Sequence, residues 1–124
     1  MTSAINSGDG FDPSCSARDA LELIASKWTM LILPLLVDGP MRNSALHRRI
    51  GGISQKMLTQ TLRDLERNGL VIRHDMQTKS LHVEYRLSPL GISLSETLAV
   101  LDRWAEHYFP QLDASRVAYD RKSK

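Results

Sequence analysis

The residues best suited to chemistry lie along one predicted helix that follows Ser54. At about 100° per residue, Leu58, Leu62 and Leu65 fall within one narrow sector and can anchor this helix to a core. Two carboxylates, Asp64 and Glu66, fall on the flanks. The side opposite the leucines carries only cations, amides and a hydroxyl: Lys56, Thr59, Gln60, Arg63 and Arg67.

Such a polar face is typical of a helix that reads double-stranded DNA. Amides and short hydroxyls exchange hydrogen bonds with base edges, and lysine or arginine binds guanine acceptors or phosphates. A face that is merely solvated is also polar, but it has no reason to exclude carboxylates. Because the N-terminal part of a recognition helix enters the major groove, we expect base contacts from Gln55, Lys56, Thr59 and Gln60. Arg63 and Arg67 lie further along and are expected to contact phosphates.

Further DNA contacts are expected from the segments on either side of this helix. Ser54 is well placed to cap its N-terminus. The preceding helix carries Arg48 and Arg49, which are additional candidates for backbone contacts. A predicted hairpin follows, whose tip can reach the flanking minor groove or its phosphates. The supporting members of the candidate surface are Ser44, Ser54, Arg73, Thr78 and Lys79.

The elements around this helix predict an α+β fold, mostly α: a winged helix-turn-helix with a two-stranded wing and additional N- and C-terminal dimerisation helices. Gly51 and Gly52 separate two short helices, which is the helix-turn-helix signature. The wing follows, with alternation of apolar and polar residues on its second strand. The expected helices cover residues from 16, 27–39, 43–50, 54–68 and from 89, and the strands cover 41–42, 70–73 and 81–87.

Within these elements, several side chains are expected in the core. The first helix should bury Leu21, Leu23 and Ile24, and Trp28 should join the core from the second helix. A pocket between the second helix and the last helix remains open as a place for a planar ligand. Pro34 removes a backbone donor inside the second helix and should kink or loosen it.

The chain divides into one domain with two extensions. Its 124 residues are enough to bury a single core. We expect a flexible arm over residues 1–14, the DNA-binding and dimerisation domain over 15–114, and a basic tail over 115–124 that frays. The N-terminus has neither a basic start nor an apolar stretch, and no run is long enough to span a bilayer, so we expect a cytoplasmic protein.

Charge is unevenly distributed along the chain. Residues 1–41 have a net charge of −3, residues 42–86 have nine lysines and arginines against four carboxylates, and the remainder is neutral. The positive segment is the one that contains the candidate reading helix, as phosphate binding requires.

No motif indicates an enzyme, a metal or a cofactor. His47, His74, His82 and His107 show no ligand spacing, and no cysteine cluster accompanies them. His47 and His74 are expected on the surface or at phosphates. There is no glycine-rich phosphate loop and no nucleophile elbow. The enzyme hypothesis rests on Cys15 alone, as a thiol catalyst, and ranks last.

Taken together and in order, the motifs resemble the HxlR family of winged-helix regulators, relatives of the MarR type. The resemblance covers residues 15–104. It rests on these elements: Cys15, Lys27-Trp28-Thr29, Gly39 and Arg42, Ile53-Ser54-Gln55-Lys56-Met57-Leu58-Thr59, Leu62-Arg63-Asp64-Leu65-Glu66, Asn68-Gly69-Leu70-Val71, Val83-Glu84-Tyr85-Arg86-Leu87-Ser88 and Gly91. Three positions depart from the family pattern. Asn43 replaces a phenylalanine and Ala25-Ser26 a glycine pair, which should alter only packing and angle, and Ser16 replaces a proline after the cysteine.

The resemblance implies a bacterial homodimer that binds a near-palindromic operator, with the first and last long helices at the dimer interface. The last helix offers an independent reason for a dimer. It carries an apolar stripe that a monomer of this size is not expected to cover fully. The alternative, that the stripe closes the monomer's own core, stays open. The stripe residues are Leu94, Leu98, Leu101 and Trp104.

Cys15 has two interpretations. It precedes a helix start and lies one turn from Arg18, and both features favour the reactive thiolate. Some members of the family sense quinones, electrophiles or oxidants through a cysteine at this position. With one cysteine in the chain, an intersubunit disulfide, a small-thiol adduct or alkylation is available. The alternative is a small apolar residue that packs at the dimer interface.

The sequence therefore predicts a dimeric DNA-binding transcriptional regulator, a repressor, whose DNA affinity responds to a small molecule or to modification of Cys15. The main rival is a winged-helix module that uses the same helix to dock another protein. The salt dependence of binding separates the two.

Overall fold

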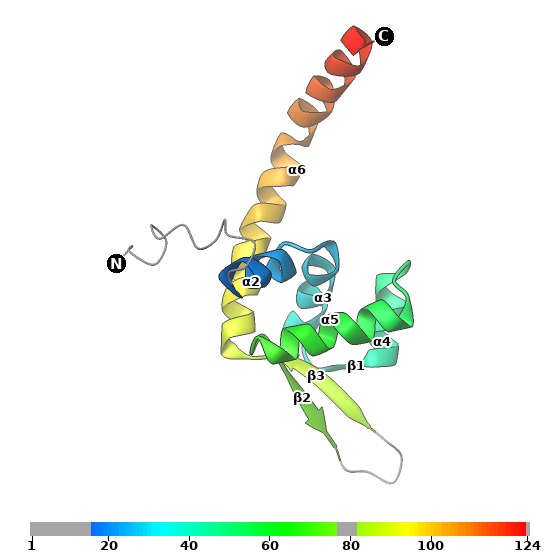
Figure 1. The fold of residues 1–124 in the computed structure, drawn as a ribbon, viewed down its shortest axis with the longest axis vertical. Coiled ribbons are helices and arrows are strands. Elements are labelled where there is room, and N and C mark those ends of the chain that lie inside the picture. Colours follow the sequence, from blue (N-terminus) through cyan, green and yellow to red (C-terminus); the bar gives the residue numbers. More distant parts are fainter. Residues whose placement is uncertain (1–15, 77–81, 124) are drawn as a thin grey trace, which may run out of the picture.

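A computed structural model describes residues 16–76 and 82–123 of the chain. Within these residues, the predicted winged-helix fold is confirmed (Figure 1). The recognisable order is helix, helix, short strand, two helices, hairpin and long helix. The elements are α2 (Ser16–Ile24), α3 (Lys27–Val37), β1 (Met41–Arg42), α4 (Asn43–Ile50), α5 (Gln55–Arg67), β2 (Val71–Asp75), β3 (Val83–Leu87) and α6 (Pro89–Ser123).

The described strands form one antiparallel sheet in the order β1-β3-β2. β2 pairs with β3 in register from Val71 opposite Leu87 to Asp75 opposite Val83. β1 pairs with the other edge of β3, with Met41 opposite Tyr85. The wing thus has a third, two-residue strand directly before α4, and this pairing ties the hairpin to the helix-turn-helix.

The core lies where α3 packs against α4, α5, α6 and β3. α3 is apolar around most of its circumference, and Ile32 and Leu33 are fully buried. Leu46 of α4 is also fully buried. Burial of each such side chain contributes about 1.5–3 kcal/mol. Because α3 touches every other part of this core, it couples the helix-turn-helix to α6.

The first helix buries less than the sequence suggested. Leu21 is 53% exposed, so its predicted burial is wrong, whereas Leu23 and Ile24 are half-buried. A helical period shows which residues share a face but not how far a neighbour covers it. Trp28 packs against the core without being fully buried, and the Lys27 ammonium lies 4.4 Å from its ring centroid.

Among the described helices, none is by itself long and apolar enough to cross a membrane. The segments Arg18–Ile24 and Lys27–Val37 meet the length and composition criterion only when taken together, and they are bent by 64°. In the second of them, Ile32, Leu33 and Leu36 are core residues. α3 is continuous through Pro34, so this proline does not end the helix.

Ser88 and Gly91 join the wing, the end of α5 and the start of α6. The Ser88 hydroxyl lies 2.5 Å from the Gly69 carbonyl oxygen and 3.1 Å from that of Leu70, and it accepts a hydrogen bond from the Gly91 amide at 2.9 Å. The Ser88 amide donates to the Leu70 carbonyl at 3.1 Å. This buried network caps α6 and fixes its direction relative to α5.

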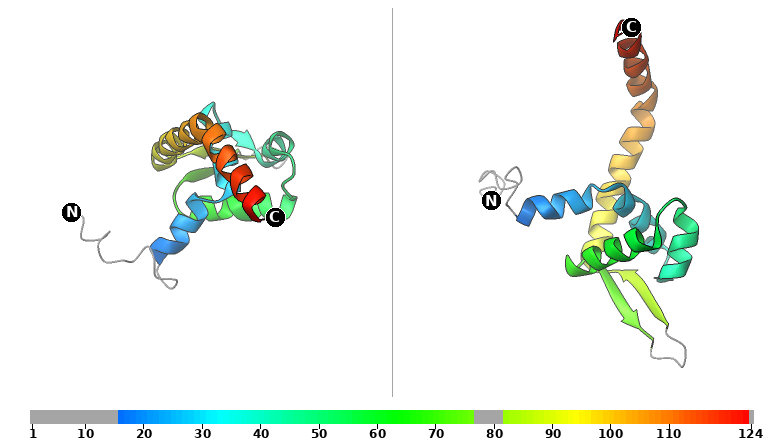
Figure 2. Two further views of the ribbon diagram at one scale, coloured as in Figure 1. Left: turned by 90° about the horizontal axis from the view of Figure 1, so that it is seen from above. Right: turned by 45° about the vertical axis from the view of Figure 1, so that its right-hand side comes forward.

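α6 is a single helix of 35 residues, about 50 Å long at 1.5 Å per residue. Its first turns pack on the body, and from residue 99 onward every described residue is exposed. The helix projects from the body on the side away from the hairpin (Figures 1 and 2). Residues 115–123 are helical, so the segment expected to fray continues α6.

Candidate nucleic-acid interface

The helix-turn-helix is closed by local contacts. Gly51 and Gly52 have φ values of 64° and 80°, which glycine adopts without the strain that a Cβ would cause. The Nε2 of His47 lies 3.0 Å from the carbonyl oxygen of Ile53 and donates to it across the turn. His47 is half-buried and holds α4 and the start of α5 together, a structural contact that the expectation of a surface or phosphate-contacting residue did not include.

The N-terminus of α5 is capped by Ser54, whose hydroxyl oxygen accepts a hydrogen bond from the Met57 amide at 3.0 Å. The cap satisfies one of the otherwise unpaired amides of the first turn. It leaves the hydroxyl proton available to a phosphate. α5 also has no acidic residue in its first turn, so the positive end of the helix dipole is not neutralised there.

The two faces of α5 lie as the periodicity predicts. Leu58, Leu62 and Leu65 have no exposed surface. Thr61 is also buried, and its hydroxyl donates to the Met57 carbonyl at 2.8 Å. Thr59 is half-buried. The remaining members of the candidate face are exposed: Ser54, Gln55, Lys56, Gln60, Arg63 and Arg67.

Gln55 is held in place by two hydrogen bonds. Its amide nitrogen donates to the Asn43 side-chain oxygen at 2.5 Å and to the Thr59 hydroxyl at 3.2 Å. Both amide protons are therefore committed, and the carbonyl oxygen of the side chain remains as an acceptor. This departure from the family pattern was expected to alter only packing and angle. Asn43 has a further role, because its side chain links α4 to the first residue of α5.

Gln60 is paired differently. Its amide nitrogen donates to the Asp64 carboxylate at 3.0 Å, which leaves a second amide proton and the carbonyl oxygen free. Asp64 is half-buried. The polar face is thus not separated from carboxylates as fully as the angular argument suggested, because a flanking carboxylate reaches Gln60. This contact positions the amide for a partner in front of α5.

The cations of α5 are available. Within the part of the chain that the structure describes, the side chains of Lys56, Arg63 and Arg67 make no ion pair or hydrogen bond. They line the exposed side of α5 as uncompensated positive charges. Such a surface attracts polyanions over several ångströms.

The flanking residues surround this face only in part. Ser44, Arg48 and Arg49 are exposed on α4, and Arg73 is exposed on β2. Thr78 and Lys79, which the sequence predicts at the hairpin tip, lie outside the described residues, as does Cys15. At the base of the wing, the His82 Nε2 lies 3.0 Å from a Glu84 carboxylate oxygen. Among the described residues, no group of three or more His, Cys, Asp or Glu side chains is arranged for a metal ion.

The apolar stripe of α6 divides where the helix leaves the body. Leu98 is 7% exposed and belongs to the chain's own core, and Leu94 is half-buried against it. Leu101 and Trp104 are each 51% exposed. The stripe continues at a four-residue spacing into Tyr108 and Leu112, which the sequence analysis did not include, and Tyr119 follows two turns later on the same face. Trp104 and Tyr108 already contact each other, with ring centroids 5.1 Å apart.

Comparisons with known proteins agree with the helix-turn-helix fold described above. The sequence profile of the HxlR-like helix-turn-helix family matches residues 23–113. The chain is 40% identical over 116 residues to the HTH-type transcriptional regulator YtfH of Escherichia coli, covering 94% of this chain and 92% of that protein. Its fold is similar to the solved structure of YtfH from Salmonella typhimurium, with a TM-score of 0.77, 42% identity and coverage of 86% and 95% of the two chains.

A third similarity concerns a relative studied with a small molecule. The structure of quinone-bound YodB from Bacillus subtilis matches with a TM-score of 0.62 and 33% identity, covering 74% of this chain and 97% of that one. The matched families and relatives are regulators rather than catalysts.

Proposed function

The chain belongs to the HxlR-like helix-turn-helix family of transcriptional regulators, and from that premise we propose that it binds a near-palindromic operator in double-stranded DNA as a homodimer. One observation supports this most: α5 turns an exposed row of cations and amides outward while its leucines are buried. One α5 would enter the major groove in each of two half-sites about one helical turn apart.

Each polar residue of the site has a distinct role in this proposal. Gln55 presents an acceptor, which suits the exocyclic amine of adenine or cytosine. Gln60 keeps a donor and an acceptor, the pair that recognises adenine through N6 and N7. Arg63 and Arg67 contact DNA phosphates on one side of the major groove. The wing contacts the DNA backbone on the other side of the groove through Arg73, Thr78 and Lys79. Lys56, Thr59, Ser54 and Ser44 complete the surface.

A bound dimer excludes other proteins from the same stretch of DNA, so repression is the simplest result of this binding. The site of action is the cytoplasm. No cofactor or metal takes part. The rival, a winged-helix module that docks a protein through α5, is an outcome of the same tests, because protein docking would not discriminate among duplexes.

Replacing Gln60 with alanine is expected to relax the preference for one base pair in each half-site, at a cost of about 1–3 kcal/mol on the preferred sequence. The physical reason is the loss of a paired donor and acceptor at a base edge. The measurement is a competition titration with operator duplexes that carry each of the four base pairs at every position.

Gln111→Ala is the matched control, since it removes an exposed glutamine from α6 rather than from α5. It should leave all affinities unchanged. If Gln60→Ala weakens binding of every duplex equally, Gln60 does not read a base. The loss then reflects only repulsion between the DNA and the Asp64 carboxylate, which in the wild type accepts a hydrogen bond from Gln60.

Cys15 is proposed as the sensor. The structure of quinone-bound YodB supports this proposal, because it contains a similar regulator with a quinone bound to it. Here the Cys15 sulfur would add to a quinone ring carbon, and the thiol proton would pass to the ring, which becomes a substituted hydroquinone. A diamide molecule would instead oxidise two thiols, one from each subunit, to a disulfide and take up the two hydrogens.

Cys15→Ser is expected to abolish release of the operator by diamide and by benzoquinone, while the untreated variant binds the operator as the wild type does. The chain has one cysteine, so the variant is free of thiols. The experiment compares operator affinity before and after treatment for both proteins. Equal release from the two would remove Cys15 from the mechanism and leave it a packing residue.

A further inference from the structure

A cavity of about 840 Å³ lies between α3 and α6, apart from the candidate DNA-binding face. Its walls are mainly apolar: Met30, Leu31, Pro34 and Val37 come from α3 and Leu98 from α6. This volume lies within the range of sites that bind small organic molecules. The cavity lies between the second helix and the last helix, where the sequence analysis considered a pocket for a planar ligand.

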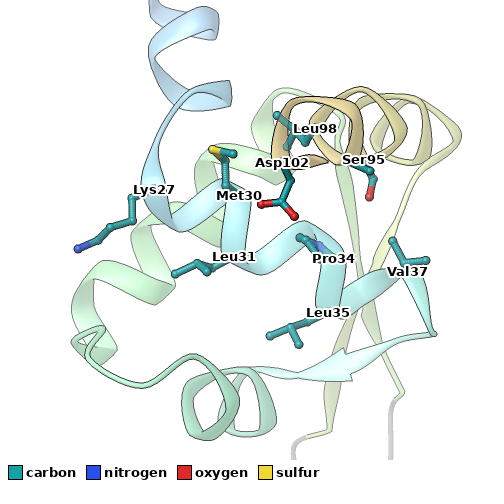
Figure 3. Close-up of a pocket in the computed structure, with 10 residues that line it drawn as sticks. Lys27, Met30, Leu31, Pro34, Leu35, Val37, Ser95, Leu98 and Asp102 are labelled. Carbon is teal, nitrogen blue, oxygen red and sulfur yellow. The ribbon is translucent and has the colours of Figure 1, made fainter. Parts of the chain in front are cut away.

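One charged group is directed into this cavity. The carboxylate of Asp102 points from α6 toward Met30 and Pro34 (Figure 3). In the described part of the chain, Asp102 has no hydrogen-bond or ion-pair partner. Lys27, at the rim, points away from the cavity in the same view and lies over the Trp28 ring instead. The cavity is therefore mainly apolar, with one available negative charge on an exposed side chain of its α6 wall.

Pro34 adds a second acceptor to the same wall. In a regular helix the residue at position 34 would donate its amide to the Met30 carbonyl, four residues earlier. Proline has no amide proton, so the usual donor to this carbonyl is missing. Both residues line the cavity. A ligand with an N–H group can donate to the Met30 carbonyl and to the Asp102 carboxylate.

From this combination we infer that the α3–α6 cavity binds a lipophilic cation, a protonated amine that carries an aromatic ring. The ring fills the space between Leu31, Val37 and Leu98, and the ammonium pairs with Asp102 near the Met30 carbonyl. A charge-assisted hydrogen bond in partly apolar surroundings is stronger than one between neutral groups. An anion of the same shape meets the Asp102 carboxylate and is rejected.

The cavity and the exposed stripe lie next to each other on α6. At about 100° per residue, Asp102 is roughly 100° around the helix from Leu101 and 160° from Trp104, whereas Leu98 is only about 60° from Leu101. Asp102 therefore faces away from Trp104, and Leu98 lies at the edge that the cavity and the stripe share. A ligand in the cavity would separate α3, on which the helix-turn-helix packs, from α6, on which the dimer is built. This regulatory consequence rests on the proposed function; the binding site does not.

The test is calorimetric titration of the full chain, without DNA, with three molecules that share one ring system: 1-naphthylmethylammonium, 1-naphthalenemethanol and 1-naphthylacetate. The ammonium compound is expected to bind about tenfold tighter than the other two, and Asp102→Asn should remove this difference. Asp113→Asn is the matched control, because Asp113 lies further along the same helix and pairs with Arg116 at 3.1 Å.

Binding of the cation that depends on Asp102 but not on Asp113 supports the site. Equal binding of all three molecules, no binding of the cation, or a change of oligomeric state in Asp102→Asn overturns it; the last result would assign the cavity to a second copy of the chain. A parallel operator titration separates the two proposals. Cation binding without DNA binding contradicts the proposed function alone, and DNA binding that the cation does not weaken contradicts only the regulatory step.

Discussion

Replacing Leu101 with glutamate is expected to convert the proposed dimer to a monomer and to lower operator affinity by about 10²–10⁴-fold, because the second half-site is then no longer bound by a linked partner. Leu101 is 51% exposed at the point where α6 leaves the body, and it neighbours Trp104 on the same face. A buried, unpaired carboxylate at the centre of an apolar interface is strongly unfavourable.

The measurement combines sedimentation with titration of a full operator and of a single half-site. The half-site affinity should be nearly unchanged, because Leu101 lies where α6 has left the body, away from α5 and the wing. Val117→Glu is the control: Val117 is 43% exposed on the same helix, but roughly 160° around it from Leu101. A Leu101→Glu protein that remains dimeric would show that the stripe is not the interface.

Gly91→Ala is expected to lower the free energy of unfolding by about 3 kcal/mol. The loss combines the cost of overpacking with the cost of one broken hydrogen bond. A Cβ at Gly91 would lie 2.0 Å from the Leu70 carbonyl oxygen and 3.2 Å from the Leu87 Cδ2. The first distance is far inside van der Waals contact, and the atom is backbone. Either α6 or the end of α5 must move, and the bond from the Ser88 amide to the Leu70 carbonyl is lost as it does.

Urea denaturation measures the effect. Ser93→Ala, at an exposed position two residues further on, should change the unfolding free energy by less than about 0.5 kcal/mol. Because Ser88 and Gly91 set the direction of α6, a Gly91→Ala protein that still folds should also bind the full operator less well than the half-site affinity predicts. An unchanged unfolding free energy would mean that the close approach is relaxed at no cost.

The sequence predicted those features of the fold that depend on local periodicity. The inward face of α5 followed from the spacing of Leu58, Leu62 and Leu65, and all three are fully buried. The cap at Ser54 followed from the residue type and its position before the helix. The alternation on the second wing strand likewise predicted β3.

Features that depend on how distant segments meet were not predictable in this way. The bond between Gln55 and Asn43 spans 12 positions and depends on the angle between α4 and α5. Leu98 and Leu101 lie on one apolar stripe, and only the point at which α6 leaves the body makes the first a core residue and the second an exposed one. The clash that excludes a side chain at Gly91 comes from Leu70, which lies in the turn between α5 and β2.

The central claim is that the outward face of α5, with the wing, binds the phosphate backbone and bases of duplex DNA. The salt dependence of operator binding tests it most directly. If Arg63, Arg67 and Lys79 of two subunits each neutralise a phosphate, the logarithm of the affinity should fall against the logarithm of the salt concentration with a slope of roughly −5, about −0.9 for each contact. A slope near zero would contradict the claim, because a surface that docks a protein through apolar contacts releases no counterions from DNA.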